Sequence, residues 1–131
     1  MIIKLDTTST IPIYVQLRNQ IVLGIGRGDL KIGEGLPTIR QMAEDIGVNT
    51  ITVNKSYAIL KQEGYIEIDR RHGAKVNPKV DLSWQFREKL ENELTLLISE
   101  SSLKGMSRDN FIDLCNDVYN RLNLLYTGGF A

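Results

Sequence analysis

Polar side chains gather just after Gly47 in the sequence. They are Asn49, Thr50, Thr52, Asn54 and Lys55. Asparagine can form two hydrogen bonds with adenine, threonine can bond a base or touch the methyl group of thymine, and lysine reaches phosphate or guanine. If these residues begin a helix, its N-terminus and the Asn49 cap can also hold a phosphate. The residue types therefore fit the reading of base edges in double-stranded DNA, although a merely solvated helix face is the alternative.

Cationic side chains lie on both sides of this cluster. Arg40 precedes it, and a basic turn follows it, made of Arg70, Arg71, His72 and Gly73. Such a turn can enter a minor groove, where arginine senses groove width and negative potential, or it can simply be solvated. Arg40 can pair with Glu44, four residues on, and contribute little. Both roles are compatible, because Glu44 can also orient Arg40 toward a phosphate.

The segment 39–58 has the spacing of a helix-turn-helix. Ala43 is small enough to let two helices cross closely, and Gly47 can take the left-handed conformation of the turn between them. Val53, six residues later, is placed to face the core. In this motif the second helix presents its N-terminal side chains to base edges, while the first crosses the DNA backbone. The polar cluster falls at that position.

Capping residues and apolar periodicity predict where the surrounding helices begin and end. An apolar stripe with a spacing of four predicts a first helix over 11–27, with Ser9 or Thr10 as its cap and Pro12 in its first turn. Thr38 is expected to cap a helix over 39–46. Asn49 or Thr50 opens the next helix, which runs to about residue 62.

A short hairpin is predicted after these helices. Residues 65–69 alternate between apolar and polar types, residues 74–76 read as a second strand, and Pro78 closes the unit. The order of helix, helix, turn, recognition helix and hairpin is that of a winged helix-turn-helix. The predicted fold class is therefore mainly α with a small β-hairpin, a winged helix-turn-helix followed by a two-helix dimerisation tail.

The N-terminal part of the chain resembles the DNA-binding domain of GntR-type bacterial repressors. The resemblance covers residues 11–76, in the segments IPIYVQLRNQI, GDLKIGEGLPTIRQMAEDIGV and LKQEGYIEIDRRHGAKV. It implies that Arg40 touches the DNA backbone and that further contacts fall on Thr50, Thr52, Asn54, His72 and Gly73. Thr50 and Asn54 replace arginines that the family often has, which weakens the implication of its usual GT/AC-type half-site.

A helical tail over 79–131 is expected to follow a DNA-binding domain over 1–78. Apolar stripes run along both tail helices, on either side of a break at Lys104 and Gly105. The stripes can pack on the first domain, line a small ligand pocket or pair with a second chain. Two short helices bury little alone, so pairing is favoured, through Leu90, Leu94, Leu97, Phe111, Leu114, Val118 and Leu122. This tail resembles that of the short YtrA-like branch of the family, which implies a dimerisation element and an association with transporter operons.

Composition limits the other classes of function. The 131 residues carry a net charge of +0, but residues 1–80 hold 11 Lys and Arg against 8 Asp and Glu, and the remainder holds 5 against 8. The basic excess predicts modest, salt-sensitive DNA affinity. One cysteine excludes a disulfide within the chain. No secretory signal and no bilayer-spanning segment is recognised, so a cytoplasmic location and no membrane association are expected.

The expected function is that of a homodimeric repressor that binds a palindromic operator. Two other functions are considered beside it. An interaction module that has lost DNA binding is motivated by the weak net charge and the missing arginines. An enzyme is disfavoured, because the sequence offers no catalytic residues, no metal-ligand spacing and no cofactor-binding motif. A small-molecule effector is compatible with the chain, but the sequence identifies none.

Overall fold

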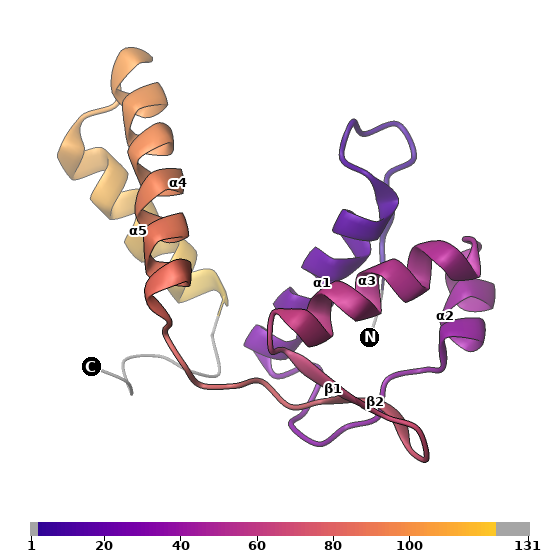
Figure 1. Ribbon diagram of the computed structural model, residues 1–131. Coiled ribbons are helices and arrows are strands. Elements are labelled where there is room, and N and C mark those ends of the chain that lie inside the picture. Colours follow the sequence, from indigo (N-terminus) through magenta and orange to yellow (C-terminus); the bar gives the residue numbers. More distant parts are fainter. Residues whose placement is uncertain (1–2, 123–131) are drawn as a thin grey trace. The chain divides into compact units, whose positions relative to one another are not determined.

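The computed structural model describes residues 3–122, which form two compact units, the first ending at Lys79 and the second beginning at Val80. The first unit contains α1 (Ile13–Arg27), α2 (Ile39–Ile46), α3 (Thr50–Gln62), β1 (Ile66–Asp69) and β2 (Gly73–Val76), as Figure 1 shows. The second contains α4 (Trp84–Leu103) and α5 (Arg108–Leu122). The predicted mainly α architecture with one small hairpin is confirmed.

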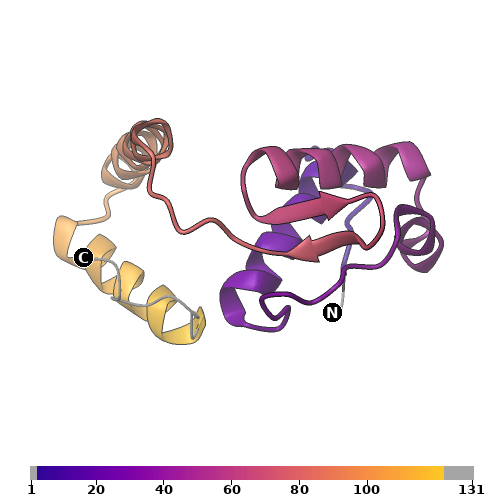
Figure 2. The same ribbon diagram turned by 60° about the horizontal axis from the view of Figure 1, so that its bottom comes forward.

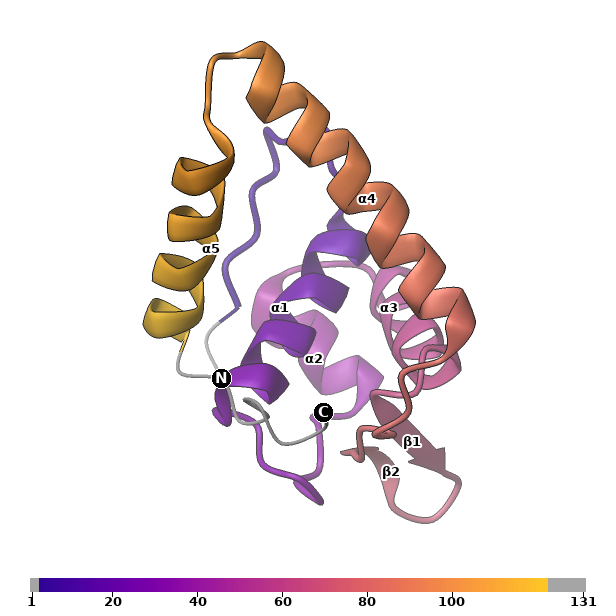
Figure 3. The same ribbon diagram turned by 90° about the vertical axis from the view of Figure 1, so that its left-hand side faces the viewer.

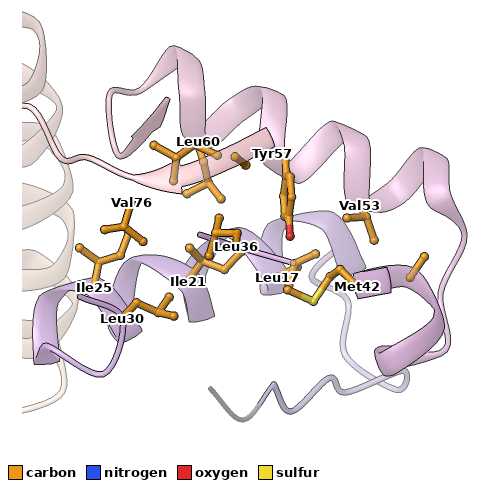
Figure 4. Close-up of a cluster of buried hydrophobic side chains, with 13 residues drawn as sticks. Leu17, Ile21, Ile25, Leu30, Leu36, Met42, Val53, Tyr57, Leu60 and Val76 are labelled. Carbon is orange, nitrogen blue, oxygen red and sulfur yellow. The ribbon is translucent and has the colours of Figure 1, made fainter. Parts of the chain in front are cut away.

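The core of the first unit lies between α1, α3 and the hairpin. The predicted stripe of α1 supplies Leu17, Ile21 and Ile25, which belong to the same buried cluster as Tyr57 and Leu60 of α3. Figure 4 shows Ile25 at one end of this cluster, beside Val76 of β2. Each fully buried aliphatic or aromatic side chain contributes about 1.5–3 kcal/mol relative to its exposed state. Because α1 supports α3 along this core, the orientation of α3 is fixed by apolar contact.

The start of α1 differs from the prediction. Pro12 occupies the cap position and no side chain caps the helix, so the predicted cap at Ser9 or Thr10 is wrong. The Ser9 hydroxyl instead accepts a hydrogen bond of 3.1 Å from the Ile11 backbone N–H. The amide of Gln16 donates to the Ile11 carbonyl at 2.8 Å. The segment before the helix is therefore held by a side chain from within α1.

The hairpin pairs with a third segment that the sequence did not predict. β1 and β2 are antiparallel, with Ile66 opposite Val76, and Figure 2 shows them running along α3. The connector before α2 adds an isolated bridge between Gly35 and Lys75. The Leu36 N–H donates to the Ala74 carbonyl at 2.8 Å. The connector and the hairpin consequently form one hydrogen-bonded assembly beneath α3.

The second unit is a helical hairpin whose turn is visible in Figure 3. The Ser83 hydroxyl accepts from Phe86 N–H at the start of α4, and the Ser107 hydroxyl accepts from Asn110 N–H at the start of α5. Gly105 has a φ of 95° in the predicted break between them. No residue of α4 or α5 is buried. No helix within residues 3–122 is long and apolar enough to cross a bilayer.

Candidate nucleic-acid interface

Local capping fixes the geometry of the α2–turn–α3 segment. Thr38 caps α2 by accepting from the Gln41 N–H at 3.0 Å, and Asn49 caps α3 by accepting from the Ile51 N–H at 2.7 Å. Gly47 lies between the helices with φ 69° and ψ 40°, a left-handed conformation that a side chain disfavours. These three predictions are confirmed, and together they set where α3 begins.

The helix α3 has a buried face and an exposed face. Its buried face consists of Val53, Ser56, Tyr57 and Leu60, and Ala43 of α2 is buried nearby. Thr50, Asn54 and Lys55 are exposed, whereas Thr52 is half-buried. The exposed polar side chains therefore share the outward face of the first two turns. The free N-terminus of a helix adds a partial positive charge at the same place.

Two polar contacts attach α3 to the rest of the unit. The buried Ser56 hydroxyl donates to the Tyr14 carbonyl of α1 at 2.7 Å. The Tyr57 hydroxyl donates to the carbonyl of Pro37, in the connector before α2, at 2.8 Å. Both bonds satisfy polar groups that would otherwise be buried at a cost of about 1–3 kcal/mol each. Because they come from consecutive residues, they fix the rotation of α3 about its own axis.

Lys55 has a structural contact that the sequence did not indicate. Its Nζ lies 3.9 Å from the centroid of the Tyr14 ring, a cation–π arrangement. The ammonium remains on the exposed side of the helix, where it can still approach a phosphate. Tyr14 thereby contacts α3 twice, once through its carbonyl and once through its ring.

Arg40 projects from the first turn of α2. Its side chain is 88% exposed, and its Nε lies 3.8 Å from Glu44 Oε1. The predicted pair with Glu44 therefore forms, but exposed pairs of this kind contribute only about 0.2–1 kcal/mol. The guanidinium keeps most of its donors free for another acceptor. Asn49 is more constrained, because its side-chain oxygen already caps α3.

The wing tip is organised by a carboxylate. Asp69 accepts from the Arg71 backbone N–H at 2.7 Å, and its other oxygen lies 3.1 Å from His72 Nδ1. These contacts, with the Arg71 N–H as the largest cause, hold the pKa of Asp69 below its ordinary value. Gly73 has a φ of 72°, and Arg70 and Arg71 are exposed. Asp69 shapes the turn and also offsets part of its positive charge.

The wing tip and the start of α3 lie toward the same end of the first unit. The chain reverses at Gly64, whose φ is 85°, and β1 then runs back along α3. Figures 1 and 2 show the turn of the hairpin on the side where α3 begins and α2 lies. The fold therefore gathers the predicted residues of α2, α3 and the wing at one end of the unit.

One exposed residue of this surface was not among the predicted site residues. Ile51, in the first turn of α3, is 74% exposed. Its spacing from Asn54 and Lys55 places all three on the same side of a helix. The spacing is visible in the sequence, but the prediction of site residues considered only polar side chains and did not include Ile51.

An α2–turn–α3 motif followed by an antiparallel hairpin defines the winged helix-turn-helix class of DNA-binding proteins. Residues 12–76 match the model of the bacterial regulatory proteins of the gntR family. The HTH-type transcriptional repressor YtrA of Bacillus subtilis (strain 168) is 30% identical over 118 residues, which cover 88% of this chain and 91% of that protein. The chain therefore belongs to the GntR family, and it is a transcriptional regulator, not an enzyme.

Two solved structures share the fold over most of the chain. YtrA from Sulfolobus acidocaldarius, a GntR-family transcription factor, has a TM-score of 0.66 at 37% identity, covering 76% of this chain and 99% of that one. A transcriptional antiterminator from Listeria monocytogenes EGD-e has a TM-score of 0.86 at 26% identity, covering 94% and 93%. The similarity to these structures extends beyond the residues of the first unit.

Proposed function

We propose that this regulator is a repressor that binds a palindromic operator as a homodimer, with one α3 helix of each chain in a major groove. The observation that carries the proposal is the two-faced α3: its back is buried and hydrogen-bonded to α1, while Thr50 and Asn54 face outward at its N-terminus. A rigidly held helix start with exposed hydrogen-bonding groups suits the reading of base edges. The relative named YtrA is a repressor, which supports this direction of control.

Each predicted contact residue has a separate role in the proposal. Thr50, Thr52 and Asn54 read bases, whereas Arg40 and Lys55 bind phosphates. Asn49 contributes through its cap and the helix N-terminus, since its side-chain oxygen is occupied. The four wing residues are assigned to the adjacent minor groove: Arg70, Arg71, His72 and Gly73.

The tail is assigned to dimerisation. Within α4 and α5 no side chain is buried, and Leu90, Leu94, Leu97, Leu114 and Val118 are each 37–53% exposed. Two helices with no buried residue lack the apolar burial that stabilises an independent unit. A second copy of the same hairpin offers a matching apolar face, and two-fold symmetry would mirror a palindromic operator. The half-buried Phe111 and Leu122 complete the proposed contact surface.

The proposed mechanism is steric. A dimer on the operator blocks polymerase, and an effector, if one binds, shifts the relative orientation of the two reading heads. Such a protein acts at the chromosome, so the proposal implies a cytoplasmic location. Control of a transporter operon is an implication of the resemblance to the YtrA-like branch.

Selection of duplexes from a random pool, at two salt concentrations, tests the proposed function. We expect enrichment of an inverted repeat whose affinity falls as salt rises, because phosphate contacts release counterions. An enriched site without two-fold symmetry would reject the palindromic dimer. No enrichment would reject specific binding and favour a protein-interaction module.

A further inference from the structure

The position of Ile51 on α3 points to a role in recognising one base of the operator. This inference rests on the proposed function. Ile51 is the second residue of the helix and is 74% exposed, between the exposed Thr50 and the half-buried Thr52. One helical turn later, on the same side, lie Asn54 and Lys55, both exposed. A single apolar side chain thus stands within an otherwise polar surface.

Exposure of one apolar residue is common on protein surfaces and carries no meaning by itself. The position of Ile51 gives it meaning, because the residues assigned to base edges surround it on α3: Thr50 and Thr52 flank it, and Asn54 lies one turn later on the same face. Its backbone N–H is fixed by the Asn49 cap at 2.7 Å. An isoleucine on a helix also has one strongly preferred side-chain rotamer. Little conformational freedom remains to be lost when this side chain meets a surface.

The chemistry of the major groove limits what isoleucine can recognise. The side chain has no hydrogen-bonding group, and the thymine C5-methyl is the one apolar group on the major-groove edges of the four bases. We propose that Ile51 reads a thymine methyl group in the operator half-site. Contact with that methyl removes apolar surface of both partners from water, which favours thymine over cytosine and over uracil at that position.

The pairing with Asn54 makes the inference more specific. Asparagine suits adenine, which it can bond through N6 and N7. Because Ile51 and Asn54 lie on one face, a turn apart, they reach neighbouring positions of the same groove. The half-site is therefore expected to contain an adenine and a thymine methyl close together, in place of the guanines that arginines would select.

Single replacement of each operator thymine by deoxyuridine tests this inference, because it removes only the methyl group. Wild-type protein should lose about three- to tenfold in affinity at one thymine per half-site, the scale expected for one buried methyl. The Ile51→Ala variant should bind the thymine and deoxyuridine duplexes equally at that position. Ile32→Ala provides a matched control, since Ile32 is 56% exposed on the connector and should leave the difference intact.

The outcomes separate this inference from the proposed function. If the selected operator binds specifically but no thymine is sensitive to loss of its methyl, the role of Ile51 is wrong and the function stands. The inference would also be overturned if Ile51→Ala lowered the affinity for both duplexes by the same factor and kept the preference for thymine, because Ile51 would then contact the DNA backbone or another protein. If no duplex is bound specifically, the proposed function fails and this inference fails with it. Thermal unfolding of Ile51→Ala should match the wild type, because the side chain is exposed.

Discussion

The hydroxyl of Tyr57, in the middle of α3, donates a 2.8 Å hydrogen bond to the carbonyl of Pro37, just before α2. Tyr57 is 2% exposed, and burial raises its pKa to about 12. The bond joins α3 to the segment that leads into α2. The bond thus holds α3 against the segment before α2. Figure 4 shows the Tyr57 side chain pointing from α3 into the apolar cluster.

Replacement of Tyr57 by phenylalanine should destabilise the fold. The ring remains, but the carbonyl of Pro37 loses its partner, at a cost of about 1–3 kcal/mol. Chemical denaturation of the wild type and Tyr57→Phe at neutral pH measures this difference. Equal unfolding free energies would show that the bond contributes nothing.

The stability difference between the wild type and Tyr57→Phe should also depend on pH. The pKa of Tyr57 is raised from 10.0 to about 12, so folding favours the neutral phenol. The associated stability is complete below pH 10 and is lost as the pH rises through about 12, because the unfolded chain ionises first. The advantage of the wild type over Tyr57→Phe should therefore shrink across this window. A constant difference up to pH 12 would contradict the burial of the hydroxyl.

Arg40→Ala should weaken binding to every duplex regardless of sequence. The guanidinium is 88% exposed and is proposed to contact a phosphate, so its loss should reduce the slope of log affinity against log salt by about one unit. Titrations at several salt concentrations give the slope. Arg27→Ala is the control, since Arg27 is exposed at the far end of α1. An unchanged slope for Arg40→Ala would show that Arg40 does not contact a phosphate.

Asn54→Ala should affect sequence preference more than overall affinity. The exposed amide is assigned to one base, so its loss should cost about 1–3 kcal/mol on the operator and relax the preference at one base pair. Binding to the full set of single-base operator variants measures this. A uniform loss on all of them would indicate a backbone contact. Gln62→Ala, at the end of α3, should change neither quantity.

A charge on the tail surface should separate the dimer. Leu94→Glu or Val118→Glu places a carboxylate among the apolar side chains assigned to the partner, and we expect folded monomers that bind operator weakly. Sedimentation velocity gives the mass. Leu103→Glu is the matched control, because Leu103 is 89% exposed and outside the proposed contact surface. Dimers of Leu94→Glu would contradict the dimerisation role of the tail.

Local signals made much of the fold predictable. The caps Thr38 and Asn49 and the turn at Gly47 each depend on bonds to residues nearby in sequence, and the structure confirms all three. The predicted caps at Ser9 and Thr10 were wrong because the Gln16 amide, a more distant group, holds that segment instead. A cap predicted from residue type alone does not account for a side chain elsewhere in the helix that binds the same segment.

Contacts between distant segments were not predictable from pattern. The bridge between Gly35 and Lys75 and the approach of Lys55 to Tyr14 join residues far apart in the chain. Neither pair has a sequence signature, because each depends on how the elements pack together. The exposure of Ile51 likewise depends on how α3 packs against its neighbours, and the sequence analysis made no prediction for this residue. In the sequence, the apolar stripe of the second tail helix continues from Leu122 to Leu125, and Leu125 lies outside the described residues.

The central claim is that the start of α3 reads DNA sequence, and one comparison tests it most directly. The affinity of the wild type for a selected operator and for a scrambled duplex is measured at one salt concentration, beside a variant with alanine at Thr50, Thr52 and Asn54. We expect a ratio of about 10³ or more for the wild type. The variant should retain its affinity for the scrambled duplex and lose most of that ratio. Equal wild-type affinity for both duplexes, or an unchanged ratio in the variant, would contradict the account.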